Sequence, residues 1–202
     1  LGIEQNTIVV FTSDHGETMC SHSLQDPKNS IFSESFNTPF MVRYPNHLKP
    51  RIDSVLLSTT DIMPTLLSLA GLGDMTPSTV EGQDLSSALR GEESAQRPSS
   101  ALYMRNLNGE RDSLGLVRGI FPEARGLKTS QYTFEMVIGR DLELKSVMII
   151  DDYADPYQLS PISVEQNPEL YAELCRELGR KLKESNDIWY RERILDQIVK
   201  YE

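Results

Sequence analysis

The most constraining feature of the sequence is the run Thr-Ile-Val-Val-Phe-Thr at residues 7–12. Its residues are β-branched or aromatic and no polar alternation interrupts them, which predicts a central strand covered on both faces. The strand ends in Ser-Asp-His-Gly at residues 13–16. Ligands of open α/β sheets gather at the carboxyl ends of strands, and a turn with Gly16 would let Asp14 and His15 converge. A carboxylate oxygen and an imidazole nitrogen both suit a metal ion, so these two residues are candidate metal ligands, with a solvated turn as the alternative.

Further elements follow in the first half of the chain. Residues 39–44 predict a second short strand, stopped by Pro45. Residues 60–69 predict a helix with Thr59 or Thr60 as N-cap and Gly71 as a stop. Strands separated by helical segments favour an α/β fold. Residues 73–100 indicate a surface connection with one short helix at 85–89.

The second half has a different pattern. Short β-rich runs separated by turn residues predict a small antiparallel sheet, with strands at 101–105, 114–120, 132–137 and 146–150. Leucines repeat every four residues from Leu170 to Leu182, and a second apolar stripe runs from Ile188 to Val199. The predicted organisation is therefore an α/β portion at 1–98, followed by an antiparallel-sheet subdomain with C-terminal helices at 99–202.

Composition excludes some classes of function. A net charge of −10 argues against a general binder of nucleic acid or of anionic membranes. No stretch approaches the roughly 18 apolar residues of a membrane-spanning helix. The two cysteines, Cys20 and Cys175, make no disulfide framework. The first residues have no signal-peptide pattern and lead directly into a strand, so we expect the chain to be part of something longer.

The run Asn-Thr-Ile-Val-Val-Phe-Thr-Ser-Asp-His-Gly-Glu at residues 6–17 resembles the metal-binding segment of the formylglycine-dependent sulfatases. These enzymes belong to the alkaline phosphatase superfamily. The resemblance continues in order along the chain, with matches at His22, Lys28, Phe32, Glu34, residues 38–45, 58–72 and 81–85, and a late Asp-Pro turn at 155–159. It is dense over residues 5–91 and thinner afterwards.

The resemblance implies the fold of the C-terminal part of a sulfatase: a mixed-sheet sandwich, then a small four-stranded antiparallel sheet with a helix. It also implies hydrolysis of sulfuric esters by a formylglycine made from cysteine or serine. That residue needs a Cys/Ser-x-Pro-x-Arg context, which this sequence lacks. The formylglycine, with two further acidic metal ligands, is therefore expected in a preceding N-terminal part. The family's cation is usually calcium, with magnesium or manganese as alternatives, and its later ligand pair matches Asp14 and His15.

Two more residues gain roles from the resemblance. Lys28 matches the lysine that touches the sulfate group, and its compact ammonium suits a tetrahedral oxyanion; the alternative is an ordinary surface lysine. His22 would contact substrate or donate a proton to the leaving oxygen. The family usually has glycines around this histidine, whereas this chain reads Cys20-Ser21-His22-Ser23, so easy access to positive φ is lost. Cys20 would either line the cleft or be a buried, inert thiol.

Alternatives remain at this point. A phosphoesterase or phosphonate hydrolase of the same superfamily would share the Asp-His ligation, and a non-catalytic C-terminal module would need none of it. The resemblance implies a small-molecule or glycan sulfate ester as the substrate, and a periplasmic or secreted protein. Trp189 and Tyr190 are predicted to pack the last helix. The acidic run Asp151, Asp152 and Asp155 predicts a solvated turn.

Overall fold

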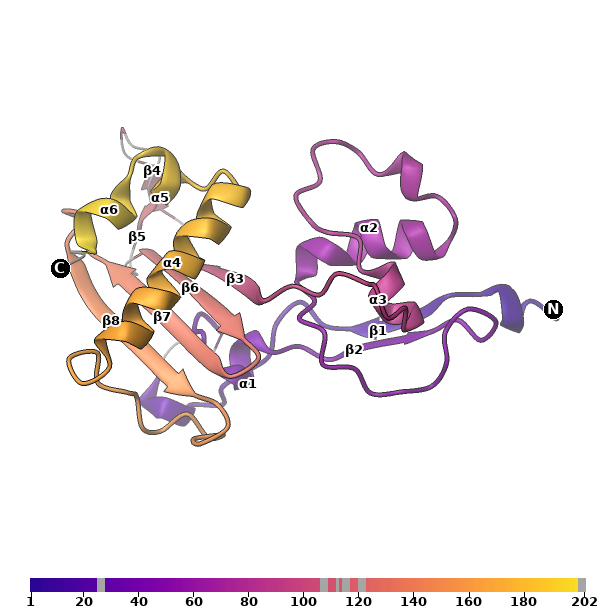
Figure 1. Ribbon diagram of the computed structural model, residues 1–202, viewed down its shortest axis with the longest axis horizontal. Helices are drawn as coiled ribbons and strands as arrows, with labels where there is room; N and C mark the ends of the chain where they lie inside the picture. Colours follow the sequence, from indigo (N-terminus) through magenta and orange to yellow (C-terminus); the bar gives the residue numbers. More distant parts are fainter. Residues whose placement is uncertain (25–27, 106–108, 112, 114–116, 120–122, 200–202) are drawn as a thin grey trace.

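The computed structural model describes residues 1–24, 28–105, 109–111, 113, 117–119 and 123–199. The chain forms two bodies side by side, a strand ribbon with short helices and a four-stranded sheet covered by helices (Figure 1). The structure is therefore of the mixed α/β kind, as the sequence predicts. In the described part of the chain, no helix combines the length and the hydrophobicity that a membrane span requires.

The ribbon of the first body consists of β1 (Val9–Thr12) and β2 (Phe40–Arg43). The two strands are antiparallel, with Val9 opposite Arg43 and Thr12 opposite Phe40. Val9 and Phe11 are 50% and 59% exposed. The prediction of a central strand covered on both faces is therefore wrong for this chain, because within the described residues β1 pairs with β2 alone. Its apolar side chains face solvent.

Helices α2 (Thr59–Leu69) and α3 (Ser86–Arg90) accompany the ribbon, together with 3₁₀ turns at Glu4–Asn6 and Gly73–Met75. A further 3₁₀ turn is formed by Ser21–Ser23. The N-cap of α2 is Ser58 rather than the predicted Thr59 or Thr60. The Asp61 carboxylate accepts hydrogen bonds from Ser58 N at 2.8 Å and from Gln83 N at 2.7 Å. One buried side chain thus satisfies the start of α2 and fixes the connection that precedes α3.

The sheet of the second body has the order β3-β6-β7-β8 and is antiparallel throughout. Its strands are β3 (Ser100–Arg105), β6 (Glu123–Thr129), β7 (Tyr132–Ile138) and β8 (Leu144–Asp151). The small antiparallel sheet is confirmed, but β6 was not predicted. The strand predicted at 114–120 lies partly outside the described residues. Its described part, β5 (Val117–Gly119), pairs with β4 (Gly109–Arg111) in a separate ribbon.

One face of this sheet is covered by α4 (Pro168–Glu184), α5 (Ile188–Arg191) and α6 (Ile194–Ile198). The predicted leucine stripe is confirmed, since Leu174, Leu178 and Leu182 are all buried against the sheet. The predicted packing role is confirmed for Trp189, which is fully buried, and is wrong for Tyr190, which is 43% exposed. The sequence predicted one helix after α4, but the structure has two, α5 and α6. They are separated by Arg193, which adopts a left-handed φ of +55°.

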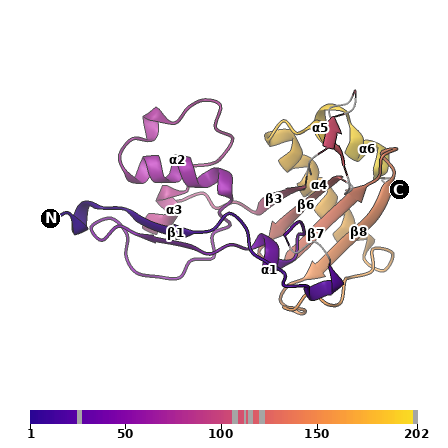
Figure 2. The same cartoon turned by 180° about the vertical axis from the view of Figure 1, so that it is seen from behind.

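The other face of the sheet is covered by a segment from the first half of the chain. Ile31 is 1% exposed and packs with Tyr103, Ala124 and Val137. Phe36, at the end of α1 (Ser33–Phe36), meets the Tyr103 ring edge-on at 5.1 Å. Figure 2 shows α1 lying against this sheet. Residues 31–36 thus pack with the second body, while the boundary at 98/99 stays a prediction.

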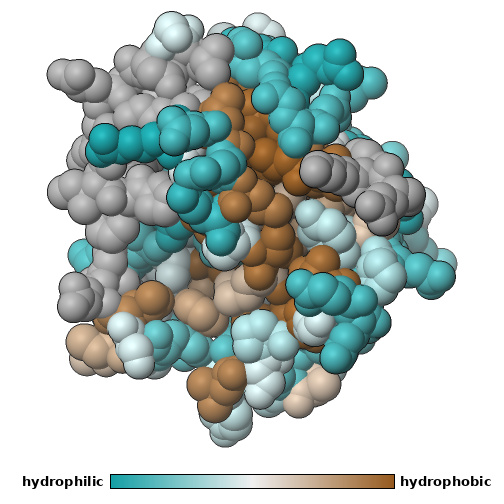
Figure 3. Space-filling view, turned by 90° about the vertical axis from the view of Figure 1, so that its left-hand side faces the viewer, coloured by the Kyte–Doolittle hydropathy of each residue, from teal (hydrophilic) through white to brown (hydrophobic). Residues whose placement is uncertain are grey.

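Apolar side chains reach the surface at both ends of the molecule. In the first body they include Val9, Phe11 and Met41, which is 58% exposed. At the other end, Figure 3 shows a band of hydrophobic side chains bordered by polar ones, on the face that lies at the left in Figure 1.

Candidate active site

Asp14 and His15 lie just beyond the end of β1, where their polar atoms converge. Asp14 Oδ1 accepts a hydrogen bond from His15 N at 3.0 Å, and Asp14 Oδ2 is 3.3 Å from His15 Nε2. The Asp14 side chain is 85% exposed and that of His15 39% exposed. The pair therefore offers an oxygen and a nitrogen to one open region.

The hydrogen bonds and charge of this pair suit a divalent cation. His15 Nδ1 is 2.8 Å from Gly16 O, a contact that favours a proton on Nδ1 and leaves Nε2 as the nitrogen available to a cation. The backbone N–H of His15 is the main cause that holds the pKa of the Asp14 carboxyl below its usual range. A carboxylate oxygen beside an imidazole nitrogen is a suitable donor pair. Within the described ranges, no three His, Cys, Asp or Glu side chains gather, so a full coordination sphere needs ligands beyond these two.

The loop that carries His22 has an unusual backbone. Met19, Cys20, His22 and Ser23 have φ values of +50°, +70°, +57° and +56°. The left-handed conformations that glycine would supply are thus present without glycine, at a cost of about 1 kcal/mol or more per residue. Cys20 is exposed, which rules out the buried thiol that the sequence left as an alternative.

His22 is held on two sides. Its ring stacks on Phe32, with ring centres 3.7 Å apart and planes 3° from parallel. Its Nε2 is 3.3 Å from both carboxylate oxygens of Glu34. The His22 side chain is only 6% exposed. The imidazole is therefore oriented by a carboxylate, an arrangement common to histidines that transfer protons.

Helix α1 joins the segments that carry the candidate residues. Gly16 N donates to Ser35 O and Glu17 N donates to Glu34 O, both at 2.7 Å. The Ser35 hydroxyl donates to the backbone oxygen of Lys28. A Cβ on Gly16 would lie 1.9 Å from Glu34 O, so only glycine permits this approach. The Asp-His turn, the His22 loop and Lys28 are thereby tied to one helical turn.

Lys28 is exposed, and its charge is one of the smaller causes of the lowered Asp14 pKa. The ammonium group thus acts electrostatically on the Asp14 carboxylate. The structure therefore brings Asp14, His15 and the charge of Lys28 into one region, and it links His22 to them through α1.

Two residues escaped the sequence analysis as site residues. Glu34 appeared only as a position of family resemblance, yet it orients His22. Gln158, in the Asp-Pro turn, accepts a hydrogen bond from Ser33 N at 2.7 Å. The nearby acidic run is not simply a solvated turn, because Asp152 pairs with Lys128 at 2.8 Å. Sequence spacing gave no signal for these contacts, since Gln158 and Ser33 are 125 residues apart.

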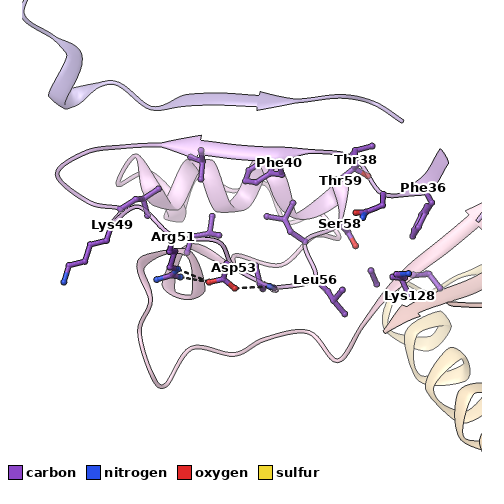
Figure 4. Close-up of a pocket in the computed structure, with 18 residues that line it drawn as sticks. Phe36, Thr38, Phe40, Lys49, Arg51, Asp53, Leu56, Ser58, Thr59 and Lys128 are labelled. Atoms are coloured by element: carbon purple, nitrogen blue, oxygen red, sulfur yellow. Dashed lines mark hydrogen bonds and ion pairs between the residues drawn. The ribbon is translucent and has the colours of Figure 1, made fainter. Parts of the chain in front are cut away.

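A separate pocket of about 380 Å³ lies beneath β2 (Figure 4). The Arg51–Asp53 ion pair, at 2.7 Å, lies on its floor, and Phe36 and Lys128 mark the end toward the sheet. None of Asp14, His15, His22 and Lys28 lines it. The candidate chemistry is therefore at the end of β1 and not in this pocket.

Comparison with known proteins bears on the identity of this arrangement. The family model described as Sulfatase matches residues 1–72, which include all four candidate residues. The endo-4-O-sulfatase of Bacteroides thetaiotaomicron is 50% identical over 204 residues, covering 100% of this chain and 40% of the relative. The chain belongs to the sulfatase family.

Solved structures agree with this assignment. A sulfatase structure from work on glycosaminoglycan metabolism by Bacteroides thetaiotaomicron is 48% identical, with a TM-score of 0.90 over 99% of this chain and 42% of that chain. A phosphonate monoester hydrolase of Agrobacterium radiobacter has a TM-score of 0.67 at 24% identity, over 91% of this chain and 36% of that chain, which shows the shared fold alone. This sulfatase chain spans about two fifths of the curated relative's length. Membership of the family implies a divalent cation and a formylglycine.

Proposed function

We propose that the protein containing this chain hydrolyses sulfate esters, with Asp14 and His15 as two of its cation ligands and Lys28 against the sulfate. The observation that carries the proposal is the convergence of a carboxylate oxygen and an imidazole nitrogen, 3.3 Å apart, near a lysine charge. This arrangement lies within the segment that matches the sulfatase family. The bound cation would screen the negative charge that repels a nucleophile from a sulfate group.

Lys28 and His22 would act on different parts of the substrate. The ammonium of Lys28 has three donors on a flexible stem and would stabilise charge on the sulfate oxygens. His22 Nε2 faces Glu34, so Nδ1 is the nitrogen left to give a proton to the leaving oxygen. Glu34 would hold that ring in a fixed orientation.

We propose calcium as the cation. Asp14 supplies a hard carboxylate oxygen, and the open surroundings of this side chain leave room for the six to eight ligands that calcium takes. Magnesium demands a stricter octahedral geometry, and manganese would tolerate the imidazole equally well. Replacing one metal by another in the intact protein distinguishes them.

We propose a sulfated glycan as the substrate, with a 4-O-sulfate inside the glycan chain as the first position to test. The support is the 50% identity to an endo-4-O-sulfatase over the whole of this chain. A polymer of this kind would be met outside the cytoplasm, so the proposal includes an exported protein. Activity in the periplasmic or culture fraction tests the location.

The exposed face of the first body has a place in this proposal. Val9, Phe11 and Met41 are each at least half exposed on the β1–β2 ribbon. Exposed apolar strands of this kind tend to pair or aggregate unless another part of the protein covers them. We propose that a preceding part of the same protein covers this ribbon and supplies the remaining cation ligands and the formylglycine. The greater length of the relatives supports this.

Sulfate release by the intact protein tests the proposal. A 4-O-sulfated glycosaminoglycan oligosaccharide is the substrate, and a phosphonate monoester is the comparison. Lys28→Ala should lower turnover by about 10²–10³-fold, as loss of one well-placed electrostatic donor does. Lys28→Arg should recover only part of it.

The matched control is Lys49→Ala, another exposed lysine. It should leave both the rate and the melting temperature unchanged. Faster cleavage of the phosphonate than of the sulfate ester would replace this function by the phosphonate hydrolase alternative. Near-normal turnover of Lys28→Ala would make Lys28 an ordinary surface lysine.

A further inference from the structure

Gln158 lies at the junction between the sheet and the segment that carries the candidate active site. Its side chain makes three hydrogen bonds: Oε1 accepts from Ser33 N at 2.7 Å, and Nε2 donates to Thr133 Oγ1 at 3.0 Å and to Asp152 Oδ1 at 2.6 Å. The residue is 2% exposed and has a left-handed φ of +56°. Such strain in a buried polar residue persists only where the surroundings hold it.

The donor side of Gln158 is anchored in a partly buried polar network on the sheet. Lys128 Nζ donates to Asp152 Oδ2 at 2.8 Å and to Thr133 Oγ1 at 2.9 Å. Thr133 is fully buried on β7, and Lys128 projects from β6. Because the two strands are paired, with Lys128 opposite Thr133, the network is as rigid as the sheet.

The acceptor side of Gln158 reaches α1. This helical turn receives Gly16 N and Glu17 N from the Asp-His turn, orients His22 through Glu34, and holds the Lys28 backbone through Ser35. Ile31 and Phe36 rest on the same face of the sheet through apolar contacts, and Arg105 of β3 donates a hydrogen bond to Asn29 O at 3.1 Å. Apolar contacts hold this segment at a set distance from the sheet but leave its orientation free to vary. A directional hydrogen bond to a single N–H restricts that orientation.

We propose that Gln158 is a positioning residue for the active site: through Ser33 it sets the orientation of α1 and thereby of the metal turn, His22 and Lys28. The inference rests on the proposed sulfatase function for its kinetic consequence. An amide is required at this position because one end must accept from Ser33 while the other donates to Asp152. A shift of about 1 Å in catalytic groups can cost about 10² in rate, so a residue outside the site can control turnover.

The test compares variants of the intact protein. Gln158→Ala should lower kcat by about tenfold or more, and hydrogen exchange should accelerate in residues 14–24 and 28–36 while β7 and β8 stay protected. Gln131→Ala is the matched control. It removes a 2.8 Å hydrogen bond to Asp151 in the same region without touching Ser33, so kcat should be unchanged.

The pH dependence of activity in Gln158→Glu distinguishes a positioning role from a purely structural one. This variant keeps the acceptor for Ser33 but sets a second carboxylate against Asp152, so its activity relative to wild type should recover as the pH falls and the new carboxyl is protonated. The charged groups on the elements around it are Lys128, Asp152, Asp151, Asp155 and Glu34.

Wild-type kcat in Gln158→Ala, or exchange that accelerates as much in β7 and β8 as in α1, would overturn the inference. If Gln158→Ala does not fold, the pH-dependent recovery of Gln158→Glu decides, and its absence counts against the inference. An intact wild-type protein that releases no sulfate contradicts the proposed function. The exchange pattern of the variants still tests the positioning role in that case.

Discussion

At the scale of single residues, the candidate site depends on close backbone approach. Gly16 N meets Ser35 O at 2.7 Å, and the Gly16 Cα lies so close to α1 that a Cβ would overlap Glu34 O. A few residues later the chain accepts positive φ at four non-glycine positions. Observed strain of this kind is often stored at functional sites. Here it puts the His22 ring between Phe32 and Glu34.

Gly16→Ala should therefore destabilise the protein by about 1–3 kcal/mol, since the added methyl group must displace backbone atoms. The matched control is Gly73→Ala, whose added Cβ would make an ordinary contact of 3.4 Å with Ser68. Thermal melting of both variants measures the effect. Equal melting temperatures would show that the Gly16 turn can relax away from α1.

Glu34→Gln tests the orientation of His22. The Glu34 side chain is 42% exposed, so the fold should survive, but the imidazole loses its anionic partner. Turnover by the intact protein should fall by about tenfold or more, as expected when a proton-transferring group loses its orienting carboxylate. Steady-state kinetics measure this. An unchanged kcat would leave His22 with a packing role against Phe32.

At the scale of elements, the antiparallel sheet and the α4 stripe were predictable because their apolar periodicity is strong. Strand β6 was not, because its buried positions other than Leu127 are charged or small. Arg125 is fully buried, pairs with Glu123 at 2.9 Å and with Asp187 at 3.1 Å, and lies over the Trp189 ring. Gly126 makes room for Ile31 on the opposite face. A hydrophobic pattern cannot predict a strand whose buried side chains contact residues far away in the sequence, here the charged Asp187 and the apolar Ile31.

The junction of α4 with β3 makes an element-scale prediction about pH. The Arg180 guanidinium lowers the pKa of Glu177 from 4.5 to about 2, and Ser99 and Ser100 also donate to this carboxylate. Because the folded pKa is depressed, the stabilisation is present above pH 4.5 and is lost as the pH falls toward 2. Glu177→Gln should melt below wild type at neutral pH, and the difference should close across that interval. A difference that stays constant with pH would contradict this; Glu173→Gln, on the same helix, is the control.

At the scale of the whole molecule, the segment between β1 and β2 is anchored on the sheet of the second body. Residues 31–36 pack on the sheet through Ile31 and Phe36, and Gln158 ties α1 to the same sheet. The sequence predicted Asp14, His15, His22 and Lys28 as a set, because the motif order carries that information. It could not predict how α1 joins them, since the contacts of α1 with the Asp-His turn are backbone hydrogen bonds, which leave no pattern of side-chain types in the sequence. Nor could it show that β1 is half exposed.

The central claim is that Asp14 and His15 hold the cation of a sulfatase. Its most direct test is sulfate release by the intact protein as a function of calcium concentration, after chelation, for wild type and Asp14→Asn. Replacing an anionic ligand by an amide should raise the half-saturating calcium concentration by about tenfold or more, with full wild-type activity restored by calcium. Identical calcium dependence in the two proteins would contradict the claim.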